Sequence, residues 1–599
     1  MEESETAEAV PNPKTYRWTD WIVGPLLFLS TAAVVVWQNS RITVLYDLSG
    51  VLEPAYRMSL GERPYVDFPF PYAPLMFLAQ AAIIKLGGTV YWHHIAYAAI
   101  TAGLATVLAW RVLLNIFRDA LAYPRSAAIL LVLPVVILGI YCIFPHPFYD
   151  PDACFVILLS VFLLLLLERR NYPSIPTFLT GVLIVVPLLI KQNIGLAFIG
   201  SVVIGFLVLA GVKRWKKLPV RGHLLVIAGV VAGIALAAGI IQAWIGLGNY
   251  FYWTWTFATS RRTPSAADML SVYQDHLLPL WLGLFATGVL ILRLNKSGRR
   301  LISFPAIVLM AVPFVWPAVY LFIDQDASER AERLANVWPV VMIASLIFSL
   351  LATRKMNGIV CILPFILVCT SHGVFLSQQL WGSTYGIWPL FALMTGLIVL
   401  SVNELTERQH GRWLIVFCAV VSISLTVSGA FYVYSNERLD YVDFEDGDMM
   451  HSTLPQLKGL SIRGSYLPDF EELVQYVNEN IPPDEGILAI PGEDLFYYAT
   501  GRRPKFPALL FDVTNNPYSA EQIADLARER DIRWLIVKND VQIETDKTID
   551  DKDHILEVLK PDFKHVESLN NYEIYRRRQP GETDDDEDDE DDSSDDSEN

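Results

Sequence analysis

The sequence predicts a mainly α-helical, polytopic membrane protein with about 13 transmembrane helices and a small C-terminal α/β domain. Three observations lead to this fold class. Hydrophobic residues make up 53% of the 599 residues and charged residues only 18%, a balance too apolar for an ordinary soluble protein. Apolar stretches long enough to span a bilayer recur between residues 20 and 434. After residue 434 the composition becomes that of a globular domain.

Residues 1–19 form a polar N-terminal segment that lacks the short apolar core and small-residue cleavage site of a signal peptide. The first apolar stretch is therefore expected to remain as a span. Because a transmembrane helix needs about 20 consecutive apolar residues, thirteen spans are predicted in the region 20–434. They lie near residues 20–38, 92–115, 126–144, 152–168, 174–191, 194–212, 223–245, 277–293, 302–323, 335–352, 357–376, 385–402 and 412–434.

One further apolar segment, residues 72–86, is either another span or a helix at the membrane surface. The positive charges of the short loops decide between these alternatives. If the segment lies at the surface, six basic clusters fall on the side of the N-terminus, as the positive-inside rule requires. The sequence thus predicts a cytoplasmic N-terminus and an extracytoplasmic C-terminal domain. The clusters lie at residues 111–125, 169–170, 213–221, 293–300, 354–355 and 408–412.

The C-terminal α/β domain is expected over residues 435–578. Helices are predicted at 469–480 and 520–530, the second because Ser519 and Gln522 have the spacing of a capping box. Short apolar strands are predicted at 487–490, 534–537 and 572–575. The domain contains no Gly-rich phosphate loop, nucleophile elbow or HExxH motif, which favours packing or acceptor binding over catalysis.

The formal net charge of -17 is mostly the charge of the last residues, because the segment 582–598 alone holds 13 carboxylates. Such a run cannot bury apolar surface and repels itself, so residues 579–599 are predicted to be a disordered, solvated tail. The five cysteines all lie in apolar segments and indicate neither a disulfide framework nor a thiolate metal site.

Several short motifs lie in the segments that this topology places outside. They read Tyr-Asp-Leu-Ser-Gly at 46–50, Gly-Glu-Arg-Pro-Tyr-Val-Asp at 61–67, Pro-Tyr-Ala-Pro-Leu at 71–75, Asp-Pro-Asp at 150–152 and Lys-Gln-Asn at 191–193. With the first span and the C-terminal domain, they resemble the GT-C superfamily of polytopic glycosyltransferases, closest to its protein-mannosyltransferase and aminoarabinose-transferase branch. The resemblance implies transfer of a sugar from a polyprenyl-phosphate-linked donor to a lipid, glycan or protein acceptor on the extracytoplasmic face. Expected partners are this donor, the acceptor and membrane lipids, and no nucleic acid.

Transfer of a sugar to a hydroxyl or amine needs a base for the nucleophile and cationic groups for the departing phosphate. Asp47 is the leading candidate for the base, because similar enzymes place a catalytic carboxylate in this loop. The alternative is that Asp47 caps a helix over residues 48–56. Asp67 is the second catalytic candidate, with a turn role as its alternative. Glu53, followed by a proline, is either structural or faces the acceptor.

Asp150 and Asp152 stand at the mouth of a span, where two carboxylates cost free energy unless they are hydrated, paired or bound to a cation. Three readings remain open: a hydrated N-cap, a divalent-cation site, and a metal-free role in binding donor or acceptor. Because the branch that the chain resembles is not generally thought to require a metal, a divalent cation is possible but not favoured. No cofactor is predicted.

Lys191, Arg330 and Arg333 are the candidates for phosphate binding. Lys191 ends an apolar span on the side that is poor in cations, with snorkelling to the interface as the alternative. The two arginines share one helix face, although neighbouring glutamates could also pair with them. Arg261 follows an aromatic run at 250–255 and could bind a lipid phosphate or a sugar. His372 is expected to be a packing residue.

Two other functions are compatible with the sequence: a transporter or lipid-linked-glycan flippase, and a non-enzymatic membrane scaffold for the outer domain. A transporter would show internal repeats and ionisable residues near mid-span, whereas no clear repeat is visible and most charges lie at span ends. The enzyme hypothesis predicts that Asp47, Asp152, Lys191 and Arg330 surround one cavity at membrane level.

Overall fold

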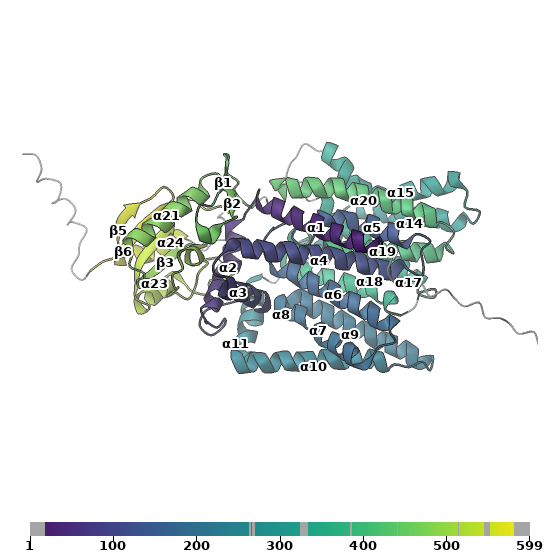
Figure 1. Ribbon diagram of the computed structural model, residues 1–599, viewed down its shortest axis with the longest axis horizontal. Helices are drawn as coiled ribbons and strands as arrows, with labels where there is room; N and C mark the ends of the chain where they lie inside the picture. The colour runs from purple at the N-terminus through teal and green to yellow at the C-terminus, as the bar shows by residue number, and fades with distance from the viewer. Residues whose placement is uncertain are drawn as a thin grey trace, which may run out of the picture.

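The computed structural model describes residues 18–262, 265, 267, 270–323, 333–356, 358–383, 386–439, 441–512, 514–543 and 552–579. A bundle of long helices carries a smaller domain of mixed helix and sheet at one end (Figure 1). This is the mainly α architecture with a small C-terminal α/β domain that the sequence predicts. The boundaries of the predicted domains stay predictions, and the predictions for residues 1–17 and 580–599 lie outside the described residues.

Each of the thirteen predicted spans corresponds to one helix or to two consecutive helices. Nine described helices are long and apolar enough to cross a membrane, in agreement with a multi-pass membrane protein, while the exact number of crossings stays a prediction. The nine are α1 (Asp20–Asn39), α4 (Tyr91–Phe117), α6 (Tyr149–Arg169), α9 (Gln192–Trp215), α10 (Arg221–Trp244), α15 (Arg300–Ile323), the helical stretch Arg333–Ala352 that includes α17 (Val337–Ala352), α19 (Trp388–Leu405) and α20 (Gly411–Tyr434).

The other four predicted spans are shorter or interrupted. They are α5 (Pro124–Val132) with η1 (Leu133–Val136), α7 (Ser174–Leu183) with α8 (Val186–Ile190), α14 (Leu278–Leu294), and η4 (Gly358–Cys361) with α18 (Leu363–Ser383). Small residues let some helices approach closely, as expected in a lipid environment. A Cβ atom on Gly181 of α7 would lie 2.3 Å from the carbonyl oxygen of Val226 in α10, so only glycine fits this crossing.

The loops that carry the predicted basic clusters contact one another at the end of the bundle away from the C-terminal domain. Arg169 donates a hydrogen bond to the carbonyl of Asn115, and Lys355 donates one to the carbonyl of Glu404. Asn403 in turn donates to the carbonyl of Ala120. These bonds join the loops after α4, α6, α17 and α19 at one end, as the charge pattern predicts. The compartment that this end faces stays a prediction.

The segment predicted to lie at the membrane surface forms a short helix, α3 (Leu75–Gly87), which packs on α2 (Leu45–Ser59). With a rise of about 1.5 Å per residue, 13 residues reach about 20 Å, less than the bilayer core of about 30 Å. Both helices lie where the bundle meets the C-terminal domain (Figure 1). The length of α3 is therefore that of a surface helix rather than of a span.

The C-terminal domain contains a four-stranded sheet in the order β3-β4-β6-β5, in which β3 pairs with β4 in parallel and the other neighbours are antiparallel. Its strands are β3 (Gly486–Ile490), β4 (Ile532–Lys538), β5 (Phe563–Ser568) and β6 (Tyr572–Arg577), and a separate pair is formed by β1 (Met449–His451) and β2 (Ser461–Arg463). The helices are α21 (Tyr466–Asn480), α22 (Phe496–Thr500), α23 (Ala520–Glu529) and α24 (Lys552–Leu559).

The predicted elements of this domain are present, and the Ser519–Gln522 capping box is confirmed. The first helix begins at Tyr466 rather than at residue 469, because Pro468 is tolerated in a first turn, where its missing N–H has no helical partner. Strands β1, β2 and β5 and helices α22 and α24 were not predicted. Most of β5 is exposed, so it lacks the apolar pattern by which a strand is recognised.

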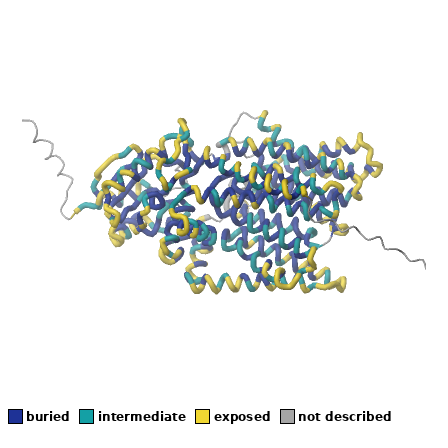
Figure 2. Tube along the Cα trace, viewed as in Figure 1, coloured by how far each residue is buried: buried dark blue, intermediate teal, exposed yellow. Residues whose placement is uncertain are grey.

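One hydrophobic cluster joins the bundle to the C-terminal domain, and a second cluster lies within that domain. The first cluster runs from the bundle through α2 into α21 and α22, and it includes Leu48, Leu52, Phe470 and Tyr498. Figure 2 shows buried chain continuing across the junction between the two parts. Helix α2 is therefore held between them, which fixes the position of the acidic residues that it carries.

Candidate active site

Asp47 lies in the first turn of α2 and is half buried at the junction. The hydroxyl of Tyr441, just beyond the last bundle helix, donates a hydrogen bond of 2.8 Å to Oδ2 of Asp47. The helix begins at Leu45, and the residue at its N-cap is Val44. The alternative reading of Asp47 as the N-cap of a helix over 48–56 is therefore wrong, because the helix starts three residues earlier.

The side chain of Gln542, in the C-terminal domain, forms hydrogen bonds with the backbone at the start of α2. Its Oε1 accepts a hydrogen bond of 2.7 Å from the backbone N–H of Leu45, and its Nε2 donates one of 3.0 Å to the carbonyl of Thr43. The first N–H groups of a helix have no partner within it, and no side chain at Val44 can supply one. A residue 497 positions away along the chain therefore does what a local cap does in other helices.

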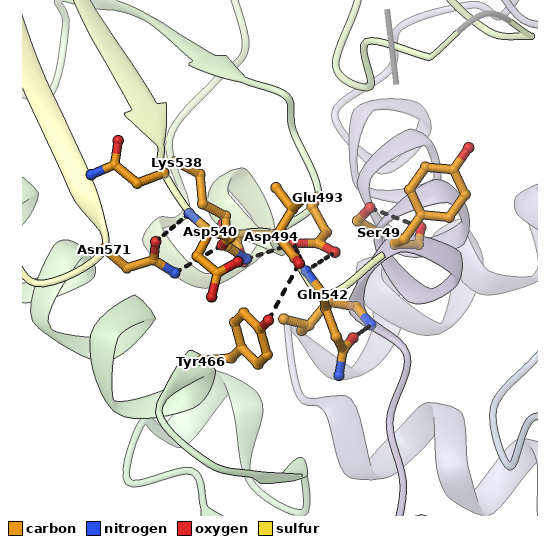
Figure 3. Close-up of polar contacts among 12 residues, drawn as sticks. Ser49, Tyr466, Glu493, Asp494, Lys538, Asp540, Gln542 and Asn571 are labelled. Carbon is orange, nitrogen blue, oxygen red and sulfur yellow. Dashed lines mark hydrogen bonds and ion pairs between the residues drawn. The ribbon is translucent and has the colours of Figure 1, made fainter. Parts of the chain in front are cut away.

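Gln542 is itself held by a buried charged cluster, shown in Figure 3. Lys538 at the end of β4 lies 2.7 Å from Glu493 and 2.8 Å from Asp494. Glu493 also accepts a hydrogen bond from the backbone N–H of Gln542, and Tyr572 donates one to Asp494. Burial alone would lower the pKa of Lys538, but the two carboxylates outweigh it and raise that pKa. The ammonium thus stays charged and fixes the loop that carries Gln542.

Glu53 lies on α2 and is buried at the same junction, with 3% of its surface exposed. The backbone N–H of Tyr498 in α22 donates a hydrogen bond of 3.0 Å to Oε1. Oε2 is buried and has no hydrogen-bond partner among the described residues. Burial raises the pKa of Glu53 to about 8, although the Tyr498 and Tyr497 amides and Arg57 act in the opposite direction. At neutral pH the carboxyl is therefore mostly protonated and can donate a hydrogen bond.

Glu53 lines a pocket of about 510 Å³, including its open mouth, between α2, residues 68–72 and residues 507–510 of the C-terminal domain. Aromatic and proline residues form nearly half of its wall, together with Ser49 and Gly50 of α2. A largely apolar wall with a few polar groups is typical of small-molecule sites.

Asp150 and Lys191, predicted separately from the sequence, form a buried ion pair. The Nζ atom of Lys191 lies 3.4 Å from Oδ2 of Asp150 and 3.7 Å from the centre of the Tyr149 ring. The Tyr149 ring stacks on Tyr72, at a centroid distance of 5.4 Å, and Tyr72 is also part of the pocket wall. The ion pair and the Glu53 pocket are therefore connected through two stacked tyrosines.

Lys191 occupies the break between α8 and α9, where the backbone is extended. The next residue, Gln192, donates hydrogen bonds of 3.0 Å and 3.1 Å to the carbonyls of Pro71 and Thr254. These bonds join the break to the proline-rich segment after α2 and to the aromatic run at 250–255. The predicted end of a span at Lys191 is therefore confirmed as a helix end.

Asp152 is bound by tyrosine hydroxyls, whereas Asp150 pairs with Lys191. The hydroxyl of Tyr97 donates to Oδ2 of Asp152 at 2.7 Å, and the hydroxyl of Tyr141 donates to Oδ1. Helix α6 begins at Tyr149, so neither acid is its N-cap, and the reading of the pair as a hydrated N-cap is wrong. In the described part of the chain no group of three or more His, Cys, Asp or Glu side chains lies close enough to hold a metal ion.

The other predicted site residues lie elsewhere. Asp67 is exposed and forms a turn with Arg63, whose N–H donates to it at 2.7 Å. Arg261 is exposed at the end of α12 (Ala258–Arg262), over the Phe257 ring. Arg333 lies over the ring of Tyr320 beside a second hollow. Arg330 is outside the described residues.

Asp47, Asp152 and Lys191 do not line the Glu53 pocket, and Arg330 lies outside the described residues, so a single cavity around these four residues stays a prediction. What the structure brings together is Asp47 and Glu53 on one helix, and the Asp150–Lys191 pair beside Tyr72. His372 accepts or donates a hydrogen bond of 2.6 Å with Tyr273, in agreement with a packing role.

The sequence reasoning missed the residues that hold these acids. Tyr441 and Gln542 lie far from Asp47 along the chain and belong to no motif. Tyr97 and Tyr141, the partners of Asp152, sit in apolar spans where an aromatic residue is ordinary. The position of Tyr441 directly after the last span was the one signal that could have placed it near the outer end of the first span.

No protein-family model and no curated protein matches the sequence. Among solved structures, the chain is similar to ArnT from Cupriavidus metallidurans bound to undecaprenyl phosphate, with 13% identity and a TM-score of 0.45 over 93% of this chain and 98% of the other. The apo state of the same protein gives 11% identity and a TM-score of 0.43 over the same shares. Similarity at this level does not assign an activity, which has to be judged from the site of this chain.

Proposed function

We propose that the chain is an integral-membrane glycosyltransferase that moves a sugar from a polyprenyl-phosphate-linked donor to an acceptor at the end of the bundle that carries the C-terminal domain. The observation that supports it most is the buried Asp150–Lys191 pair at a helix break, beside the junction that holds Asp47 and Glu53. A lipid-linked donor keeps its tail in the bilayer, so its phosphate and sugar are presented at this depth.

In the proposed reaction an acceptor hydroxyl attacks the anomeric carbon of the donor sugar. The new carbon–oxygen bond forms while the bond from that carbon to the phosphate oxygen breaks, and the phosphate leaves with the electron pair. The hydroxyl proton passes to Asp47, which Tyr441 holds in place through one carboxylate oxygen. General-base catalysis of this kind contributes about 10²- to 10⁴-fold to a rate.

Lys191 is proposed to neutralise the charge that develops on the leaving phosphate. Asp150 and the Tyr149 ring hold its ammonium at a fixed place, so little reorganisation is needed when the charge appears. Asp152, Arg261, Arg333 and Arg330 stay candidates for donor binding, and Asp67 for acid–base chemistry.

The test uses the purified protein in proteoliposomes, a panel of radiolabelled polyprenyl-phosphate sugars and an extract of envelope lipids and glycans as acceptor. Transfer from at least one donor is expected, and Asp47→Asn should reduce it at least 100-fold. The exposed Asp525→Asn on α23 serves as the matched control. Full transfer by Asp47→Asn with unchanged thermal unfolding would remove the proposed base, and no transfer by the native protein from any donor would remove the function.

The proposed orientation has the N-terminus in the cytoplasm and the C-terminal domain outside. Asp67 and Lys216 are both exposed and lie in segments predicted to face opposite compartments. An impermeant thiol reagent added to intact cells should modify a cysteine at Asp67 and spare one at Lys216. The reverse pattern would contradict the orientation.

A further inference from the structure

The Glu53 pocket has the composition of a site for an uncharged, hydroxyl-rich ligand. Among the described residues that line it there is no lysine or arginine, and Glu53 is the only acid. The nearby Arg57 is not part of the wall, because its guanidinium is used by Glu62 and by the carbonyls of Phe506 and Pro507. A phosphate would find no cation here, so the pocket does not fit the charged part of a lipid-linked donor.

One buried polar atom points to what the pocket holds. Oε2 of Glu53 has no partner among the described residues, and the side chain is almost wholly buried. An unpaired buried polar group costs free energy, which a ligand hydrogen bond would recover once the Glu53 side chain turns this oxygen toward the pocket. The other polar side chains of the wall, Ser49, Tyr72 and Asn515, are neutral, as suits the hydroxyls of a sugar.

The remaining residues of the wall offer apolar surface to the C–H groups of a sugar ring. Phe68, Phe70 and Tyr72 contribute aromatic surface, and Leu509 and Leu510 contribute aliphatic surface. The face of an aromatic ring carries partial negative charge and attracts weakly positive C–H groups, which a sugar presents on one face. Aromatic surface beside one carboxyl and small neutral polar groups is thus complementary to a sugar ring.

We infer that this pocket binds one uncharged sugar ring of the acceptor, with Glu53 as its central hydrogen-bonding group. The inference rests on the proposed function for the identity of the ligand as acceptor, whereas binding of a neutral sugar is a property of the pocket alone. Because the C-terminal domain supplies six of the fifteen residues of the wall, it takes part directly in selecting the acceptor.

The protonation of Glu53 should control the affinity. The charged groups near its carboxyl are Arg57 on α2 and Asp494 in the C-terminal domain, and the amides of Tyr497 and Tyr498 face it from α22. The effect of burial outweighs that of Arg57 and the two amides, which lower the pKa, and it raises the pKa of Glu53 to about 8. Below this pH the carboxyl donates and accepts hydrogen bonds, whereas above it the carboxylate can only accept them.

Saturation-transfer NMR on the full-length protein in nanodiscs tests the binding directly. The probes are methyl α-D-mannopyranoside, methyl α-D-glucopyranoside and methyl β-D-galactopyranoside, with glucose 1-phosphate as the charged comparison. At least one methyl glycoside should give a signal at pH 6.5, and glucose 1-phosphate should give a weaker one. No signal from any glycoside, or a stronger one from the phosphate, would overturn the inference.

Two sets of variants connect the signal to the pocket. A Cβ atom at Gly50 would meet nothing nearer than Leu510 Cδ2 at 3.9 Å, so Gly50→Trp places its ring in the pocket and should weaken binding at least tenfold. Gly283→Trp, at an exposed glycine of α14, is the matched control. Glu53→Ala should weaken binding at least tenfold. Glu53→Gln should retain it and should lose the decrease that the native protein shows between pH 6.5 and pH 9.5.

Unchanged binding in both Gly50→Trp and Glu53→Ala would place the sugar elsewhere and overturn the inference. The Glu53 pair decides the matter if Gly50→Trp fails to fold. Asp47→Asn separates the two proposals: it should lose transfer and keep glycoside binding. If Asp47→Asn retains transfer while Gly50→Trp loses binding, the proposed base fails and the pocket stands.

Discussion

Replacing Gln542 with alanine tests whether the C-terminal domain holds the start of α2. The variant removes the acceptor of the Leu45 N–H and the donor to the Thr43 carbonyl, both within 3.0 Å in the native protein. Each backbone group left buried without a partner costs about 1–3 kcal/mol. Because water can enter the space left by the side chain, we expect a total near the lower end, about 2–4 kcal/mol.

This cost is local, so it is measured by hydrogen exchange rather than by global unfolding. Since 1.4 kcal/mol corresponds to about a factor of ten, amide protection in a peptide covering residues 43–52 should fall about 30- to 1,000-fold in Gln542→Ala. The exposed Gln475→Ala on α21 is the matched control, because it loses only a surface hydrogen bond to Glu479. Unchanged exchange over residues 43–52 would refute the reasoning, since it would mean that the hydrophobic contacts of α2 alone hold its first turn.

Three further predictions concern buried ionisable side chains. Lys538→Met leaves two carboxylates without their ammonium and should destabilise the C-terminal domain by about 3–5 kcal/mol, seen as a lower Tm than that of the exposed Lys505→Met. Lys191→Met should reduce sugar transfer at least 100-fold in proteoliposomes, and retained transfer would remove its proposed role. The pKa of Glu53 is raised from 4.5 to about 8, so its contribution to stability is complete below pH 4.5 and is lost as the pH rises through 8. The loss amounts to about 5 kcal/mol over this window. Glu53→Gln should abolish this fall in a pH series of Tm, and an identical fall in the variant would contradict it.

The helices of the bundle could be predicted because an apolar window of fixed length is imposed by the bilayer itself. The interruptions were harder to predict. Two predicted spans break near Pro134 and near Pro187, as expected for a residue without an N–H. Yet α15 runs unbroken through three prolines, because its neighbours determine whether the chain bends or breaks. Proline alone therefore does not locate the breaks.

Some residues of the candidate site could likewise be predicted from the sequence, and others could not. Asp150 and Lys191 were recognised because charged residues at the ends of apolar spans are costly and rare, and the structure places them in contact. Tyr441 and Gln542 were not recognised, because their role depends on contacts across 394 and 497 positions of sequence. For Asp67 the structure shows a turn contact with Arg63, and its catalytic role stays a prediction, because a turn carboxylate and a catalytic one have the same local sequence pattern.

The buried charges at the junction indicate a role in ligand binding rather than in stability. At the far end of the bundle, Asp20 is 4% exposed but its partner Arg125 keeps 32% of its side-chain surface exposed, so only one member of that pair is fully desolvated. At the junction, by contrast, the Asp150 and Lys191 side chains are only 5% and 11% exposed. Apolar residues of similar size in place of a buried ion pair are often as stable or more stable. Charges that cost free energy and gather beside a pocket with an unpaired carboxyl oxygen are best explained by a ligand that uses them.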